Sequence, residues 1–107
     1  AAIIPSELKT LAFAAGQDAP EEALMAELEV LGQKLAVNRL ARVTVTAYAG
    51  MGEGVDARAA RKLSLARAMV VRDALMMGGA TSDQVRMRAL GANVAAGSPE
   101  RVDLTDY

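Results

Sequence analysis

The chain of 107 residues contains no cysteine, no histidine and no tryptophan. Without thiolates or imidazoles it lacks the usual zinc ligands, the most common general base and the most reactive nucleophile. We therefore expect neither an enzyme nor a metal or cofactor site. The lack of cysteine does not indicate the cellular compartment, because a chain without thiols is unaffected by the redox state of its surroundings.

Aromatic residues are scarce, at 3% of the chain, and the charges almost cancel to a net value of -1. Few aromatic rings leave little with which to build a base-stacking platform. A nearly neutral chain also has no overall field that attracts nucleic acid. We therefore expect no nucleic-acid partner, and a ferredoxin-like nucleic-acid module is the disfavoured alternative.

Long hydrophobic runs are missing too. No uninterrupted apolar segment reaches the roughly 18 residues that span a bilayer, and no basic segment precedes an apolar one as in a signal peptide. The length and the 52% of hydrophobic residues predict a single globular domain over residues 1–107. The abrupt apolar start suggests a domain of a longer protein, with residues 1–7 as an N-terminal extension.

Hydrophobic periodicity predicts an α+β fold of order β-α-β-α-β-β. Alternation predicts four strands, over 8–13, 42–48, 85–90 and 101–105. Leucines at helical spacing predict a helix over 20–38, and a second helix over 57–77 is stopped by two glycines. We expect both helices on one face of a mixed parallel and antiparallel sheet, closed by a hairpin of the last two strands.

Arg67 stands on the apolar face of the second predicted helix, in line with Ala60, Leu63, Val71 and Ala74. Burying a guanidinium without a partner is costly, so we expect an anion or another acceptor beside it. Two interpretations are open. The head reaches an acidic side chain or a carbonyl of the chain, or it binds the carboxylate of a ligand.

Glycine-rich residues 49–55 precede this helix, and a loop of this kind can bind phosphate at a helix N-terminus. The segment lacks the Walker lysine and the dinucleotide fingerprint. Glu53 and Asp56 would also repel an anion. Nucleotide binding is therefore disfavoured.

Three apolar residues, Leu65, Met69 and Met76, fall among charged residues on the outer side of the second helix. Scattered exposed apolar side chains are common. A line of three can instead form a contact surface for a partner protein or for a homodimer.

Four segments resemble the OmpA-like peptidoglycan-binding domain, and the resemblance extends over nearly the whole chain. Residues 11–13 resemble its opening strand, and 85–91 its strand that ends in glycine. Residues 99–104, Pro-Glu-Arg-Val-Asp-Leu, resemble its closing Asn-Arg-Arg-Val-Glu-Ile strand. The most specific match is 62–68, Lys-Leu-Ser-Leu-Ala-Arg-Ala, which is similar to its helix with a Leu-Ser pair followed by Arg-Ala.

The resemblance implies a non-catalytic domain that anchors its parent protein to peptidoglycan. In the family, an aspartate after the second strand binds the amino group of diaminopimelate in the stem peptide. The arginine of the Leu-Ser helix, here Arg67, binds its carboxylate. The implied location is the periplasm of a bacterial cell envelope, with a parent protein attached to a membrane such as the cell outer membrane.

The chain departs from this pattern in its recognition residues. The family sequence Gly-His-Thr-Asp is replaced by Ala47-Tyr48-Ala49-Gly50, so that Gly50 stands in place of the aspartate. The helical asparagine is Ala60. The first arginine of the closing pair is Glu100, which leaves only Arg101.

We hypothesise that Glu53 or Asp56 supplies the missing carboxylate. The predicted ligand-binding residues are thus Arg67, Tyr48, Gly50, Glu53, Asp56 and Arg101. The preferred interpretation is an anchor to peptidoglycan with a modified pocket. The alternative is a degenerate OmpA-like scaffold for protein–protein interaction in the envelope, in which wall binding is weak or lost.

Overall fold

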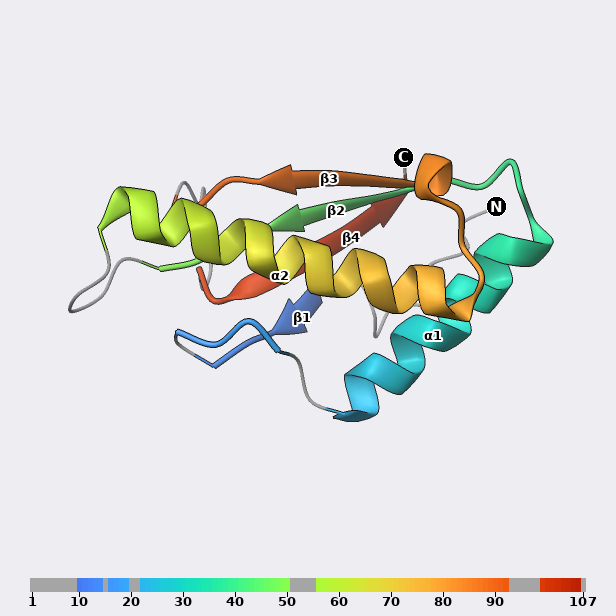
Figure 1. The fold of residues 1–107 in the computed structure, drawn as a ribbon, viewed down its shortest axis with the longest axis horizontal. Coiled ribbons are helices and arrows are strands. Elements are labelled where there is room, and N and C mark those ends of the chain that lie inside the picture. Colours follow the sequence, from blue (N-terminus) through green and yellow to red (C-terminus); the bar gives the residue numbers. More distant parts are fainter. Residues whose placement is uncertain (1–9, 15, 20–21, 51–55, 93–98, 107) are drawn as a thin grey trace.

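The computed structural model of the chain describes residues 10–14, 16–19, 22–50, 56–92 and 99–106. Two helices pack against a four-stranded sheet, as the sequence predicted (Figure 1). The elements are β1 (Thr10–Ala12), α1 (Glu22–Val37), β2 (Val43–Ala47), α2 (Ala57–Gly78), β3 (Val85–Ala89) and β4 (Arg101–Asp106). The expected extension over residues 1–7 lies outside the described residues.

The strands follow the order β1-β4-β2-β3, which corrects the predicted hairpin. β2 and β3 are parallel, whereas β4 lies antiparallel between β1 and β2 and does not pair with β3. Burial explains the difference. β4 buries Val102 and Leu104 completely, as suits a central strand, while β3 exposes Arg86 and Arg88, as suits an edge.

The core lies between the sheet and the two helices. The leucine stripe predicted for α1 is buried at Leu28, Leu31 and Leu35, and the alternation predicted for β2 is buried at Val43 and Val45. Both periodicities therefore identified the faces that meet. Among the described residues, no helix is both long enough and apolar enough to cross a bilayer.

The two helices cross at glycines in almost direct backbone contact. A Cβ added at Gly32 of α1 would lie 2.0 Å from the carbonyl oxygen of Leu75, and one added at Gly78 of α2 would lie 2.0 Å from that of Glu29. Real side chains do not approach a carbonyl this closely. The crossing thus fixes the C-terminal turns of α2 against α1.

We predict that Gly32→Ala lowers the free energy of unfolding by about 1–3 kcal/mol, because the added methyl group separates the helices. Helix propensity alone would raise it by about 1 kcal/mol. Urea unfolding followed by circular dichroism measures the sign. An increase in stability would contradict the close crossing.

Candidate functional site

Arg67 lies in the middle of α2 and is completely buried. Three of its guanidinium N–H groups donate to backbone carbonyls of loops that leave the sheet. Nε donates to Gln17 O at 2.7 Å, Nη1 to Tyr48 O at 2.9 Å and Nη2 to Ala14 O at 3.1 Å. The guanidinium carbon also lies 5.0 Å from the centroid of the Phe13 ring, a distance at which a cation and an aromatic face attract.

Glu100, immediately before β4, takes the remaining two donors. Its Oε1 accepts from Nη1 of Arg67 at 3.5 Å, and its Oε2 accepts from Nη2 at 3.3 Å. A guanidinium has five N–H donors, so every donor of Arg67 has an acceptor within the chain. The side chain of Glu100 is 20% exposed. Arg67 itself is therefore buried, and its partner Glu100 is partly exposed to solvent.

The carboxylate of Glu100 is held in its ionised form. Burial raises its pKa, but the N–H of Gly50, the guanidinium of Arg67 and the N–H of Gly16 together lower the pKa below the ordinary value of 4.5. The pair thus carries one negative and one positive charge at neutral pH.

The backbone of Gly50 lies directly against the side chain of Glu100. A Cβ added at Gly50 would lie 3.0 Å from Oε1 of Glu100 and 3.0 Å from Cγ of Pro99. A side chain at this position would therefore push against the carboxylate. The absence of a side chain at Gly50 therefore leaves room for the carboxylate of Glu100.

Tyr48 and Arg101 meet each other, but their side chains lie away from Arg67. The guanidinium carbon of Arg101 is 4.7 Å from the centroid of the Tyr48 ring, and its Nε donates to both carboxylate oxygens of Asp103 at 3.2 Å. Val102, which lies between Arg101 and Asp103 in β4, faces the core. Arg101 and Asp103 therefore point to the opposite face of the sheet. Tyr48 contributes to the Arg67 site through its carbonyl.

Asp56 caps α2. Its Oδ1 accepts the N–H of Ala59 at 2.8 Å, and the structure gives it no bond to Arg67. Glu53 lies outside the described residues, so the hypothesis for this residue stays a prediction. The described residues contain no group of three or more acidic side chains placed to hold a metal ion.

The partner of Arg67 is the residue that sequence reasoning missed. In the sequence, Glu100 stands only as an expected departure from the family pattern. One signal points to such a partner: an arginine on a buried helix face needs an anion. An acid where the resemblance implies a base is a candidate for that anion.

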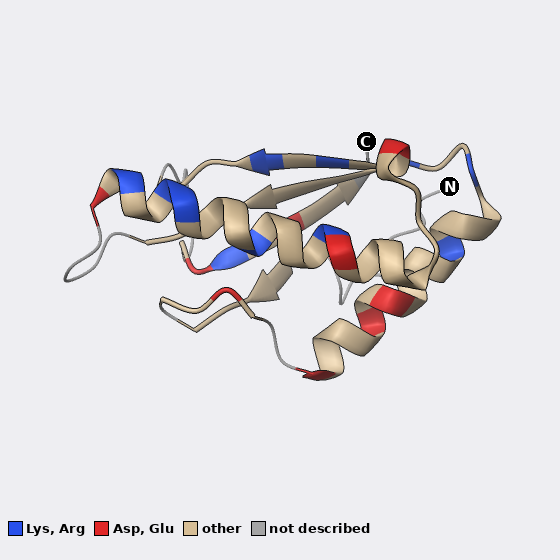
Figure 2. Ribbon diagram, in the orientation of Figure 1, with Lys and Arg blue, Asp and Glu red and all other residues tan. Residues whose placement is uncertain are grey.

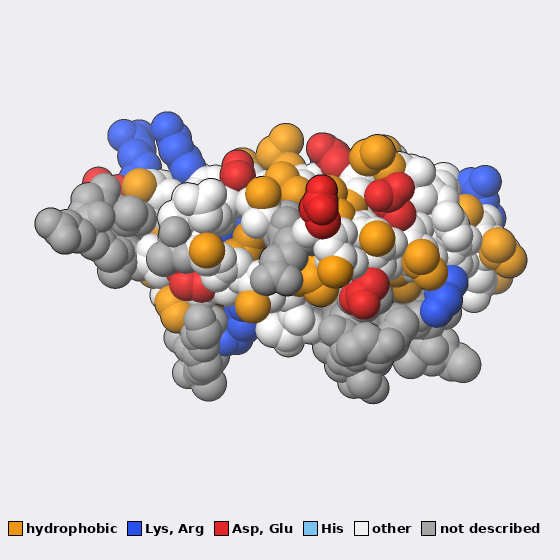
Figure 3. Space-filling model, turned by 90° about the horizontal axis from the view of Figure 1, so that it is seen from below, with side chains coloured by type: hydrophobic (Ala, Val, Ile, Leu, Met, Phe, Trp, Pro, Cys, Tyr) orange, Lys and Arg blue, Asp and Glu red, His pale blue; other side chains and the backbone are white. Residues whose placement is uncertain are grey.

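The charged side chains are unevenly distributed over the helices. Acidic residues concentrate on α1, and basic residues on the first turns of α2 and along β3 (Figure 2). Hydrophobic side chains stand between charged ones on the side seen in Figure 3.

Leu65, Met69 and Met76 are 45%, 40% and 39% exposed, as the sequence led us to expect. A partner for them stays a prediction.

We predict that Arg67→Lys lowers the free energy of unfolding by about 2–4 kcal/mol, because an ammonium has three donors and cannot match five fixed acceptors. Arg72→Lys is the matched control, since Arg72 is partly exposed and pairs with the neighbouring Asp73. It should change stability by less than about 0.5 kcal/mol. Equal effects in urea unfolding would contradict the buried network.

We predict that Glu100→Gln removes a pH-dependent part of the stability. The folded pKa of Glu100 is lowered, so its contribution is complete above the unfolded pKa and is lost as the pH falls through the folded one. Wild type should exceed the variant in free energy of unfolding at pH 7, and the gap should narrow as the pH falls below the ordinary pKa of 4.5 and through the lowered folded pKa. Parallel stability curves would show that Glu100 is not the ionised partner.

Comparison with known proteins places the chain in a family. The profile of the OmpA family matches residues 12–101. No curated protein sequence gives a significant match to the chain.

Solved structures share the fold at low sequence identity. The peptidoglycan-associated lipoprotein from Burkholderia pseudomallei is 18% identical, with a TM-score of 0.77 over 92% of this chain and 90% of that one. The OmpA-like domain of FopA1 from Francisella tularensis is 18% identical, with a TM-score of 0.71 over 92% and 73%. The C-terminal domain of Helicobacter pylori MotB is 16% identical, with a TM-score of 0.73 over 92% and 83%. Since the profile covers most of the sequence and the fold agrees, the chain belongs to the OmpA family.

Proposed function

We propose that this domain attaches its parent protein noncovalently to peptidoglycan through the diaminopimelate residue of a stem peptide, and catalyses no reaction. Membership of the OmpA family and the shared fold with a peptidoglycan-associated lipoprotein support the ligand class. The observation that carries the proposal is the pair of Arg67 and Glu100, a buried cation and a partly exposed anion fixed side by side.

The pair offers both charges that the zwitterionic end of diaminopimelate requires. Glu100 lies against Gly50, the position of the family's aspartate, and so replaces the missing carboxylate from another strand. Its ionised carboxylate, on a side chain that is 20% exposed, can accept hydrogen bonds from the ammonium group of the ligand. In this proposal Glu100 takes the part that the sequence had suggested for Glu53 or Asp56.

The carboxylate of the ligand then has to share Arg67 with Glu100. The bonds between Arg67 and Glu100, at 3.3 and 3.5 Å, are longer than its three bonds to carbonyls, at 2.7 to 3.1 Å. They are the longest of the five, and they lead to the only mobile acceptor group among the five, a side-chain carboxylate that is 20% exposed. We propose that the ligand carboxylate takes these two donors while Glu100 turns to the ammonium group.

This ligand places the domain in the periplasm, within the bacterial cell envelope. The parent protein would be attached to a membrane, such as the outer membrane, by parts outside these residues. A domain bound to peptidoglycan would then hold its parent protein at a fixed distance from the peptidoglycan layer.

A second candidate function is a protein-interaction scaffold that has lost wall binding. The observation that favours it is that every donor of Arg67 already has an acceptor within the chain. The pair would then be purely structural. Contacts in the envelope, with a partner or a second copy, would pass through Leu65, Met69 and Met76, which are exposed on α2.

A titration followed by NMR separates the two functions. We predict that a muropeptide with diaminopimelate causes saturable shifts of the amides of Gly50 and Glu100. A muropeptide with lysine at the same position lacks one carboxylate, so it should bind at least about tenfold more weakly. No shift with either ligand at millimolar concentration would favour the scaffold. Equal shifts with both ligands would contradict recognition of the second carboxylate of diaminopimelate.

A further inference from the structure

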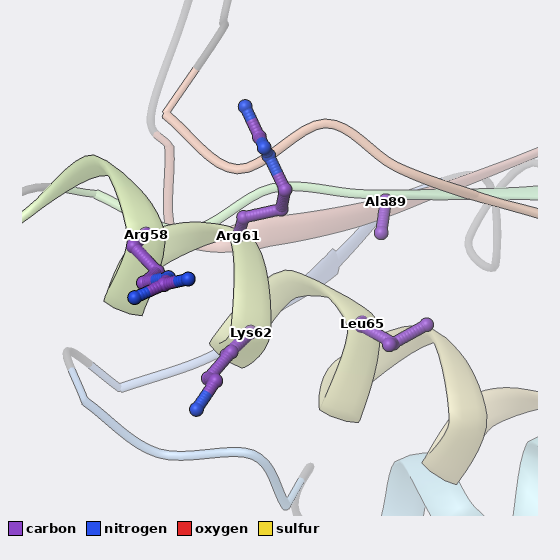
Figure 4. Close-up of a pocket in the computed structure, with 5 residues that line it drawn as sticks. All are labelled: Arg58, Arg61, Lys62, Leu65 and Ala89. Atoms are coloured by element: carbon purple, nitrogen blue, oxygen red, sulfur yellow. The ribbon is translucent and has the colours of Figure 1, made fainter.

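A basic groove lies at the start of α2. Arg58, Arg61 and Lys62 are all exposed there, and with Leu65 of α2 and Ala89 of β3 they line a groove of about 390 Å³ (Figure 4). Arg58 and Lys62 point to the same side of α2, whereas Arg61 extends to the other side. Positive charge therefore lies on two sides of the first turns of α2.

This concentration of charge opposes helix formation. Cations are unfavourable near a helix N-terminus, whose partial charge is positive, and Arg58 repels Arg61 and Lys62 at spacings of three and four residues. Within the described part of the chain, none of the three forms an ion pair. The carboxylate of Asp56, the acidic residue at this end of α2, accepts the N–H of Ala59. A bound anion would relieve this repulsion.

The groove lies at the same end of the domain as the Arg67 site. A Cβ added at Gly91 would lie 3.2 Å from the Cα of Arg61, so the loop after β3 runs directly past the groove. The oxygen of Gly91 in turn accepts the N–H of Ala49, which precedes Gly50, at 2.9 Å. The loop after β3 therefore connects the groove with the end of β2, where the carbonyl of Tyr48 and the N–H of Gly50 contribute to the Arg67 site.

We propose that the basic groove is a second contact for peptidoglycan and binds the free carboxylates of stem peptides next to the one held at Arg67. This inference rests on the proposed function. Peptidoglycan presents many carboxylates along one polymer, and three cations without an ion pair among the described residues complement them. Leu65 and Ala89 supply an apolar floor against which the aliphatic parts of a peptide pack. The contact acts through charge, so salt weakens it.

Co-sedimentation with purified cell-wall sacculi tests this contact. The double variant Arg58→Glu/Arg61→Glu should be retained about five- to tenfold less than wild type at about 20 mM NaCl. The difference should fade towards about 500 mM NaCl. Its melting temperature should be equal or higher, because acids suit a helix N-terminus. If this variant does not fold, Arg58→Gln/Arg61→Gln should show the same effect to a smaller degree.

Lys34→Glu/Arg39→Glu is the matched control, since it changes the net charge by the same amount near the far end of α1. It should sediment as wild type does. An equal loss in both double variants, or no loss in Arg58→Glu/Arg61→Glu, would overturn the proposal. So would loss of wild-type binding to anionic phospholipid vesicles in that variant with sacculus binding intact, which would assign the groove to lipid.

A soluble muropeptide with a single stem distinguishes this inference from the proposed function. It reaches only the Arg67 site, so wild type and Arg58→Glu/Arg61→Glu should bind it equally. Equal binding together with reduced retention on sacculi supports the groove. Failure of wild type to bind both the muropeptide and the sacculi would overturn the proposed function, and the groove with it.

Discussion

The site depends on one buried cation. The guanidinium of Arg67 draws together the carbonyls of Ala14 and Gln17 after β1, that of Tyr48 after β2, and the carboxylate of Glu100 before β4. A buried charge that loses its partners costs several kcal/mol. The same contacts that satisfy the arginine therefore hold three strand ends against the middle of α2. The shape of the candidate site follows from satisfying this group.

The negative charge at the site comes from Glu100, the residue immediately before β4. Gly50 has no side chain to offer, and the space in front of it is filled by Glu100, which its N–H helps to hold. A ligand with both charges would meet an anion already in place and a cation behind it. Binding would then be an exchange of carboxylates on Arg67, in which a neutral or singly charged ligand gains little.

The sequence predicted the parts that depend on local pattern. The leucines of α1 and the alternation of β2 revealed their buried faces, and Arg67 stood out because it broke an apolar stripe. The hairpin between the last strands was wrong, because periodicity describes one strand and says nothing of its neighbour. Glu100 was missed for a similar reason. Its pairing with Arg67 joins residues 33 positions apart, and no local spacing encodes such a contact. Tyr48 stays a predicted ligand-binding residue, and the structure adds that its backbone carbonyl accepts a hydrogen bond from Arg67, which no side-chain pattern could predict.

The most direct test of this account is the rate at which the Nε–H proton of Arg67 exchanges with solvent, measured by NMR on protein labelled with ¹⁵N in arginine. The account predicts a resolved signal that exchanges far more slowly than that of Arg72, because Nε donates to Gln17 O inside the fold. Exchange as fast as that of an exposed arginine would contradict it.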